Sequence, residues 1–418
     1  MLGTSLSFQT IAIPSLAVAL SAGSGIAPGF APLDSALVLF GQRRYAEALP
    51  RFERAVADSP RNAVARCGVA ETKRRLGREA EAVKDARFWL AIERCSACAH
   101  GVLADCYDPM TSAWDQANAD SAWAHFSGAA ACDPRGGDAW LGAWRYAIVR
   151  GDSARERQSL DALSDLGWFP PALVAYNRWQ LESLPPRAVL LTRGDQDSWP
   201  SSMLQGAAGV RADVAVVNLS LLDWPDYARA IGRRAGLPLP AWLDTVRARP
   251  APAVAAAGAT GAIAERIVAA WADSAKRGAL PRPLVVGAGA ARIGETPALR
   301  GRLTFAGPYY TVARDTGGAE EDPARLAATV AAIDPPAFTG SWAAGTDRRG
   351  SVPAAGAAGL GANLLAATLL HGRIALEAGD RPGAVAALAK LDSLTAVMGA
   401  GEVMRGRIRR LRAAVAPH

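Results

Sequence analysis

The first part of the chain alternates small and bulky apolar residues at intervals of three and four positions, with polar residues between them. Ala48, Phe52 and Ala55 lie on one face of a predicted helix that ends before Pro60. Small residues let two helices approach closely, a bulky residue fills the space between them, and proline cannot continue a helix. Small and bulky residues with the same spacing return 34 residues later, at Gly77, Ala82, Ala86 and Trp89. The pattern therefore predicts helical hairpins that repeat along the chain.

Further units continue this pattern. They begin near Ala97 (with an insertion at 108–113), near Trp140 and, far downstream, near His371. Over about residues 29–170 and 360–398 the chain resembles the tetratricopeptide repeat (TPR) family. This resemblance implies a solenoid of helical hairpins that binds a protein or peptide on its concave face.

After Pro185 and Pro186 the helical period gives way to short apolar runs. We expect strands at 188–192, 213–219 and 283–287, helices at 201–209, 225–235 and 261–277, a loop at 220–224, and a hairpin formed by 302–305 and 309–313. Strands that alternate with helices favour a parallel sheet with right-handed crossovers. The predicted fold class is therefore α/β plus all-α. A TPR solenoid carries an inserted parallel-sheet module of three to five strands and a C-terminal TPR-like hairpin.

Four regions follow from these patterns. They are a leader at 1–28, TPR-like repeats at 29–184, the α/β module at 185–315, and a helical region at 316–418 with one TPR-like hairpin at about 365–398. The uncharged segment Ile11–Ala22 has the length of a signal-peptide apolar region, and a small-residue stretch follows it. A mis-called start or an unstructured leader is the alternative. We expect an exported, periplasmic or membrane-tethered protein in preference to a cytoplasmic one.

The middle of the chain resembles a second family. The turn Gly194, Asp195, Asp197, Ser198, Trp199 and Pro200 is followed by a segment over 209–222 that begins Gly-Val-Arg and contains Asn-Leu-Ser-Leu-Leu. These residues, together with 282–289, resemble the soluble C-terminal part of large bacterial membrane proteins of glycosyltransferase type, whose function is uncharacterised. The resemblance covers roughly 180–315. The multi-span half, where sugar transfer would occur, is not in this sequence, so we do not carry that activity over.

Polar side chains follow the predicted strands. Asp195, Asp197 and Trp199 come after the first strand, and Asn218 ends the second. Ligands in parallel sheets bind beyond the carboxyl ends of the strands. We therefore predict that these four residues bind a ligand, with a saccharide as the candidate. A helix cap formed by one of the aspartates is the alternative, and acid–base hydrolysis is a third.

Cys95, Cys98, His100 and Cys106 form a metal-like spacing that is a weak candidate for zinc. Ordinary packing within a repeat explains the same residues. If the chain is exported, a Cys95–Cys98 or Cys95–Cys106 disulfide becomes the alternative. The other three histidines, His125, His371 and His418, show no partners in the sequence.

Charge adds little to these functional hypotheses. The 46 basic side chains exceed the 39 acidic ones, but the charge is diluted along the chain and nucleic acid is not an expected partner. The arginines over 405–412 give the last helix a cationic face, which predicts either a solvated surface or peripheral contact with an anionic membrane. The loop Gly287–Gly289 lacks the third glycine of a dinucleotide motif, because Arg292 stands there. We expect no cofactor.

The patterns together favour a non-enzymatic TPR adaptor, associated with a bacterial cell envelope, that mediates protein–protein interaction. The alternative is an accessory or recognition module for glycan or protein-glycosylation assembly, which binds a saccharide at the acidic strand-end loop.

Overall fold

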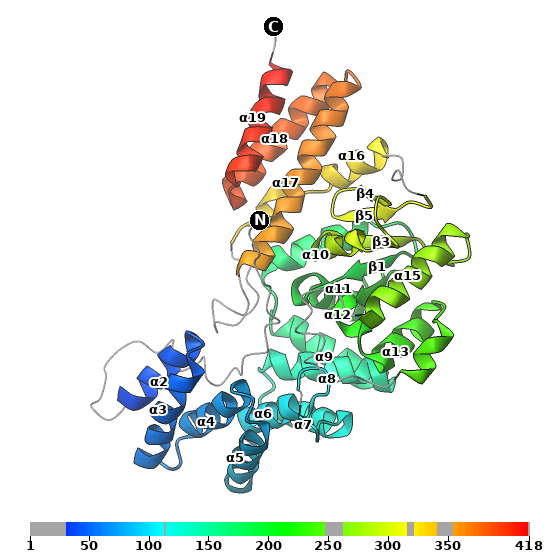
Figure 1. Cartoon of the computed structure of the whole chain (residues 1–418). Helices are drawn as coiled ribbons and strands as arrows, with labels where there is room; N and C mark the ends of the chain where they lie inside the picture. Colours follow the sequence, from blue (N-terminus) through cyan, green and yellow to red (C-terminus); the bar gives the residue numbers. More distant parts are fainter. Residues whose placement is uncertain (1–30, 113, 247–261, 316–321, 341–353, 417–418) are drawn as a thin grey trace. The chain divides into compact units, whose positions relative to one another are not determined.

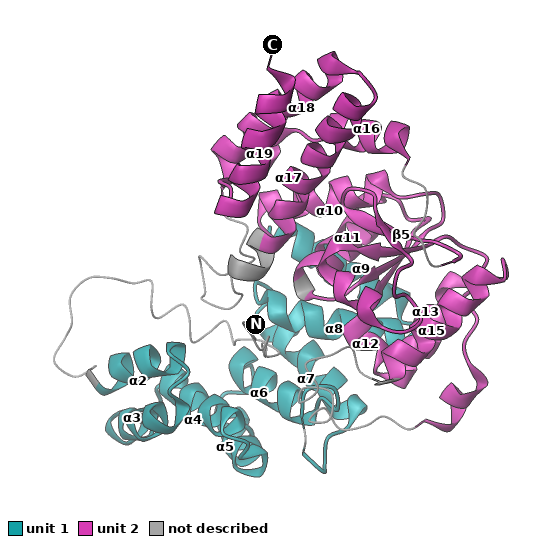
Figure 2. Ribbon diagram, turned by 45° about the horizontal axis from the view of Figure 1, so that its top comes forward, with its two compact units in different colours: residues 1–168, 247–259, 345–352 teal, residues 169–246, 260–344, 353–418 magenta. Residues whose placement is uncertain are grey.

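A computed structural model describes residues 31–112, 114–246, 262–315, 322–340 and 354–416. The predicted leader at 1–28 lies outside the described residues. The chain divides into two compact units, and they are shown in different colours in Figure 2. Unit 1 contains the described residues up to Trp168, and unit 2 contains those from Phe169 onward. Within the described residues, none of the helices combines the length and apolar character that a membrane span requires.

Unit 1 consists of helical hairpins, and this confirms the TPR-like prediction. The helices are α2 (Ala31–Gly41), α3 (Tyr45–Asp58), α4 (Ala63–Arg75), α5 (Glu79–Ile92), α6 (Ala97–Tyr107), α7 (Ala119–Cys132), α8 (Gly137–Arg150) and α9 (Ser153–Asp165) (Figure 1). Each helix packs against the next one along the chain, so that successive hairpins stack in order. Side chains cap the first turns of α4, α6, α7 and α9: Asn62, Ser96, Asn118 and Asp152.

One packing rule recurs at two hairpin junctions. The buried Phe52 ring of α3 lies against Gly68 of α4, where a Cβ atom would come within 2.4 Å of the ring. Phe126 of α7 lies in the same way against Gly142 of α8, where a Cβ would come within 2.2 Å. Both pairs are sixteen residues apart in the sequence. The glycines are required because the aromatic rings occupy the space that any side chain would need.

Buried ion pairs join the first helices of three hairpins. Arg74 of α4 binds Glu71 at 2.7 Å and Asp105 of α6 at 3.2 Å. Arg145 of α8 binds Asp108, which follows α6, at 3.3 Å. Removing one partner from such a pair would leave a buried charge without compensation, so these contacts link neighbouring hairpins energetically.

Unit 2 contains a mixed five-stranded sheet, and the α/β prediction is confirmed. The strands are β1 (Val189–Thr192), β2 (Ala215–Asn218), β3 (Leu284–Gly287), β4 (Leu303–Phe305) and β5 (Tyr309–Val312), in the order β2-β1-β3-β5-β4. β1 pairs in parallel with β2 and β3, and the expected hairpin of β4 and β5 adds an antiparallel edge. All residues of β1, β2 and β3 are buried, as expected for strands covered on both faces.

Helices surround this sheet and continue to the C-terminus. They are α10 (Pro171–Ser183), α11 (Asp195–Ala208), α12 (Leu219–Leu222), α13 (Pro225–Ala235), η2 (Ala241–Thr245), α15 (Ala262–Lys276), η3 (Ala288–Glu295), α16 (Pro323–Ala331), η4 (Pro335–Phe338), α17 (Ala354–Glu377), α18 (Arg381–Met398) and α19 (Glu402–Val415). α17 and α18 form the expected C-terminal hairpin. Lys390 of α18 donates to the carbonyls of Val330, Ala331 and Ile333 at the end of α16, and this holds the hairpin in place.

Two local predictions were wrong. The segment expected as a loop at 220–224 contains the short helix α12. The helix after β1 begins at Asp195 and not at Ser201, although Pro200 lies inside it. Proline has no N–H for the Gln196 carbonyl, and the Asn177 side chain supplies that donor at 2.8 Å. A residue from α10 therefore makes the proline compatible with the helix.

Candidate functional site

The topology of unit 2 places a switch point at the carboxyl ends of β1 and β3. β1 lies between β2 and β3, so the chain crosses from one side of β1 to the other after β2. Such a switch point is where parallel sheets bind ligands, since the loops on either side turn away from each other. α11 follows β1 at this edge, and η3 follows β3.

Asp197 joins the two loops at this edge. It is the third residue of α11, is only 3% exposed, and its carboxylate accepts the backbone N–H groups of Gly194 at 2.8 Å and Arg193 at 3.1 Å. Its second oxygen faces Gly289 after β3, where a Cβ atom would come within 2.5 Å. Asp197 thus stabilises the start of α11, and the loop after β3 needs a glycine to accommodate it.

Asn218, at the end of β2, has a similar role. Its side-chain oxygen accepts the N–H groups of Ser220 at 2.8 Å and Leu221 at 3.3 Å, and so it caps α12. The Ser220 hydroxyl then donates to the Arg193 carbonyl at 2.9 Å, which ties the loop after β2 to the loop after β1. Trp199 is buried in α11.

The structure places some of the predicted ligand residues at the expected edge, but it leaves few of their polar atoms open to a ligand. Asp197 and Asn218 lie at the predicted edge, but their oxygens hold backbone N–H groups, and Trp199 has no exposed ring face to offer a sugar. Asp195 begins α11, and its side chain lies outside the described residues. Binding of a saccharide by these four residues stays a prediction.

The same edge holds polar residues that the sequence analysis did not assign to a site. Burial lowers the pKa of the Arg193 guanidinium, the nearby charge of Arg292 lowers it further, and Asp197 opposes both. Asn363 of α17 donates to the Tyr176 hydroxyl at 3.2 Å. Burial raises the pKa of Tyr176, and the Asp197 carboxylate adds to this effect. These contacts join elements distant in the chain, so no local pattern marks them.

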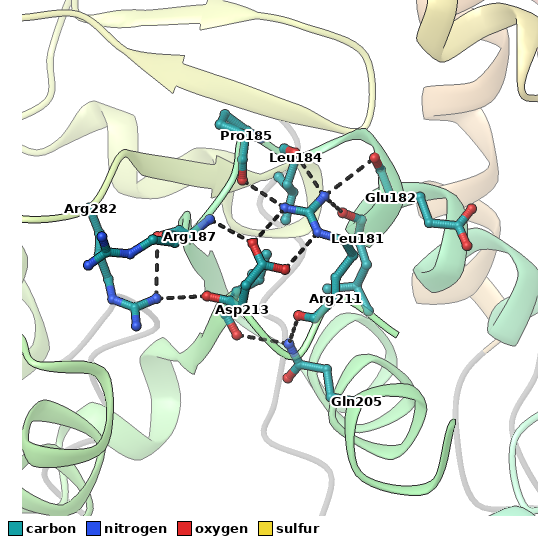
Figure 3. Close-up of polar contacts among 10 residues, drawn as sticks. Leu181, Glu182, Leu184, Pro185, Arg187, Gln205, Arg211, Asp213 and Arg282 are labelled. Atoms are coloured by element: carbon teal, nitrogen blue, oxygen red, sulfur yellow. Dashed lines mark hydrogen bonds and ion pairs between the residues drawn. The ribbon is translucent and has the colours of Figure 1, made fainter. Parts of the chain in front are cut away.

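The Gly-Val-Arg motif of the second resemblance forms a structural clamp (Figure 3). Arg211 has a left-handed backbone, with φ of 46°, and its guanidinium donates to the carbonyls of Leu181 at 3.0 Å, Leu184 at 2.9 Å and Pro185 at 2.9 Å. Asp213 binds the same guanidinium at 2.8 Å. Arg211 thereby adds donors to carbonyls in the last turn of α10 and just beyond it, where the regular helical hydrogen bonds stop. This arrangement fixes the route of the chain into β1.

In unit 1 the structure pairs the cysteines differently from the expected bridges. The disulfides are Cys67–Cys98 and Cys95–Cys132, and Cys106 is a buried thiol. Burial raises the pKa of Cys106, which keeps the sulfur protonated. Cys95 and Cys98 are therefore not available as zinc ligands. His100, the fourth member of the suggested set, lies beside His125.

Comparison with known proteins gives a match to one family. Residues 174–241 match TMEM260-associated domain 2. No curated protein matches the chain. Among solved structures, a thermophilic TPR protein of Thermus thermophilus is similar, with 18% sequence identity and a TM-score of 0.32, over 50% of this chain and 97% of that one. The matched family range contains the loop after β1 and the Arg211 clamp, and it leaves the hairpins of unit 1 outside.

Proposed function

We propose that the chain is a non-enzymatic adaptor that binds a protein partner through the hairpin array of unit 1. The observation that carries this proposal is the unbroken stacking of α2 to α9. Phe–Gly contacts, buried ion pairs and two disulfides hold the array together. A stack of this kind presents an extended preformed surface, and binding to it requires little reorganisation of the adaptor.

The surface of α5 is the proposed contact region. Phe88 and Ile92 lie one turn apart on the same face of α5 and are 52% and 49% exposed. The Arg66 guanidinium lies 4.9 Å from the centre of the Phe88 ring. An aromatic side chain beside an arginine is a frequent centre of protein–protein contacts. We propose a partner segment that places an apolar side chain on Phe88 and Ile92 and a carboxylate near Arg66.

The disulfides support a location outside the cytoplasm. Four of the five cysteines are paired, and disulfides persist mainly in oxidising compartments. We therefore propose that the adaptor works at the cell envelope.

The test uses a photo-crosslinking residue placed at Leu76, an exposed position next to α5, in the native host. A captured protein is then purified, and its affinity is measured by calorimetry. We expect Phe88→Ser with Ile92→Ser to weaken binding at least tenfold. Val385→Ser is the matched control, because Val385 is 50% exposed but lies in unit 2. Equal binding by all variants would contradict the proposed surface.

The alternative function, an accessory or recognition module in glycan assembly, keeps its own test. It rests on the resemblance of 180–315 and on the switch point at the carboxyl ends of β1 and β3. Saccharide binding is tested on a glycan array with three proteins: the wild-type chain, Asp197→Asn, and Asp226→Asn as an exposed control on α13. A saccharide bound by wild type and Asp226→Asn but not by Asp197→Asn would favour this alternative over the adaptor.

A further inference from the structure

Two histidines of unit 1 face each other within the third hairpin. His100 of α6 and His125 of α7 place their Nδ1 atoms 3.0 Å apart, with ring centres separated by 5.2 Å. Both side chains are half-buried. In the sequence analysis His125 had no partner, because the two residues are 25 positions apart and lie on different helices.

Surrounding residues hold both rings in place. The His100 ring lies against Gly128, where a Cβ atom would come within 2.8 Å of it. The His125 ring stacks on Tyr107, with the ring planes 12° apart. The Tyr107 hydroxyl in turn accepts a hydrogen bond from Arg87 at 2.5 Å. These contacts restrict the orientation of both imidazole rings.

Both imidazoles are neutral at pH 7. The pKa of His125 is lowered to about 4, mainly by burial, with smaller contributions from the neighbouring His100 and Arg87. Burial also lowers the pKa of His100. A hydrogen bond between His100 and the backbone of Arg94 opposes that shift, as expected for a ring N–H that donates to a carbonyl. If that donor is Nε2, the Nδ1 facing His125 keeps its lone pair.

We propose that His100 and His125 bind one divalent transition-metal ion, such as Zn²⁺, Ni²⁺ or Cu²⁺. Imidazole nitrogens coordinate these ions at about 2.0–2.1 Å, so two nitrogens on one ion are about 2.9 Å apart at a right angle and about 3.4 Å apart in a tetrahedron. The observed 3.0 Å lies within this range.

Water completes the coordination of this ion. Across the described ranges, no group of three or more histidine, cysteine or acidic side chains is placed to hold a metal. The site is therefore a two-histidine clamp between α6 and α7. α7 ends at Cys132, and the disulfide to Cys95 holds that end of the helix. The ion binds the folded hairpin more tightly than the unfolded chain, because folding brings the two imidazoles together, so it stabilises unit 1 by mass action.

The proposal is tested on the full, oxidised chain after chelator treatment and dialysis. Titration with ZnCl₂ at pH 7.5 is followed by calorimetry and by the melting temperature. We expect one ion per chain, a higher melting temperature, and at least tenfold weaker binding in His100→Gln and in His125→Gln. His371→Gln is the matched control, because His371 is a half-buried histidine of unit 2. It should bind Zn²⁺ as wild type does.

A spectroscopic measurement keeps the test independent of the variants. X-ray absorption of the Zn²⁺-loaded wild-type chain should show two imidazole ligands at about 2.0 Å together with water oxygens. Each metal is tested up to about 1 mM, which is on the order of the dissociation constant of a weak chelate. The proposal is overturned if none of Zn²⁺, Ni²⁺ and Cu²⁺ binds at that concentration. Equal binding by folded His100→Gln, His125→Gln and wild type, or a spectrum without imidazole, would also overturn it. The pair is in those cases an internal hydrogen bond.

Discussion

Replacing Arg211 tests whether the Gly-Val-Arg motif acts as a structural clamp. Arg211→Ala removes a guanidinium that donates to three main-chain carbonyls at the end of α10 and binds the Asp213 carboxylate. Arg282→Ala is the matched control. Its guanidinium donates to the Asp213 carbonyl at 2.8 Å in an exposed position, on the other side of the same cluster (Figure 3).

The expected magnitude follows from these contacts. A hydrogen bond from a charged donor contributes about 1.5–3 kcal/mol when it is buried. The Arg211 side chain is 22% exposed, and water can replace part of each bond, so the three carbonyl contacts together contribute roughly 2–4 kcal/mol. Alanine gains nothing in return, because the left-handed backbone at this position disfavours it as well. The exposed bonds of Arg282 should contribute about 1 kcal/mol or less.

Urea unfolding at 25 °C measures both variants. Tryptophans are buried in both units, among them Trp179 and Trp271 in unit 2 and Trp89 and Trp144 in unit 1, so fluorescence follows both transitions and only that of unit 2 should shift. We expect the midpoint of Arg211→Ala to fall by about 1–2 M, given a slope of about 2 kcal/mol per M. Arg282→Ala should change the midpoint by less than about 0.5 M. Equal midpoints for the two variants would refute the clamp, and lost ligand binding with unchanged stability would assign Arg211 to a site.

Three further predictions concern unit 1. Gly68→Ala should destabilise unit 1 by about 1–3 kcal/mol, because the new Cβ meets the Phe52 ring. In calorimetry its melting temperature should fall, whereas that of Gly41→Ala should change little, because the space around Gly41 is open. Reduction of the two disulfides, which span 31 and 37 residues, should lower the melting temperature of unit 1 in calorimetry. Each disulfide contributes about 3–4 kcal/mol by restricting the unfolded chain. Peptide mapping without reductant should recover both pairs, and any other pairing contradicts the structure. Burial raises the pKa of Asp105 to about 6, above its unfolded value of about 3.9. The folded chain therefore binds this proton more tightly than the unfolded chain does. The free energy of unfolding should fall as the pH rises from about 4 to about 6. Asp105→Asn should flatten that dependence in urea unfolding at several pH values, and an unchanged slope would show that Asp105 does not cause it.

The sequence by itself determined the elements of the fold. The spacing of small and bulky residues in unit 1 predicted the hairpins, because the face that a helix buries recurs every three to four residues. The apolar runs predicted the strands β1, β2 and β3, and the helix predicted at 225–235 has the bounds of α13 as the structure has them. Such patterns are local, so they report burial within one element without knowledge of its neighbours.

Only the tertiary structure decided which elements and side chains meet. The cysteine pairing, the contact of His100 with His125, and the donor from Asn177 that admits Pro200 into α11 all join residues from different elements. Asp197 shows the same limit at the candidate site, because its residue type suits a ligand and a helix cap equally well. Its burial and its two backbone donors are fixed by how α11 packs on the sheet. A pairwise contact depends on the relative placement of two elements, and the periodicity of either one carries no information about that placement.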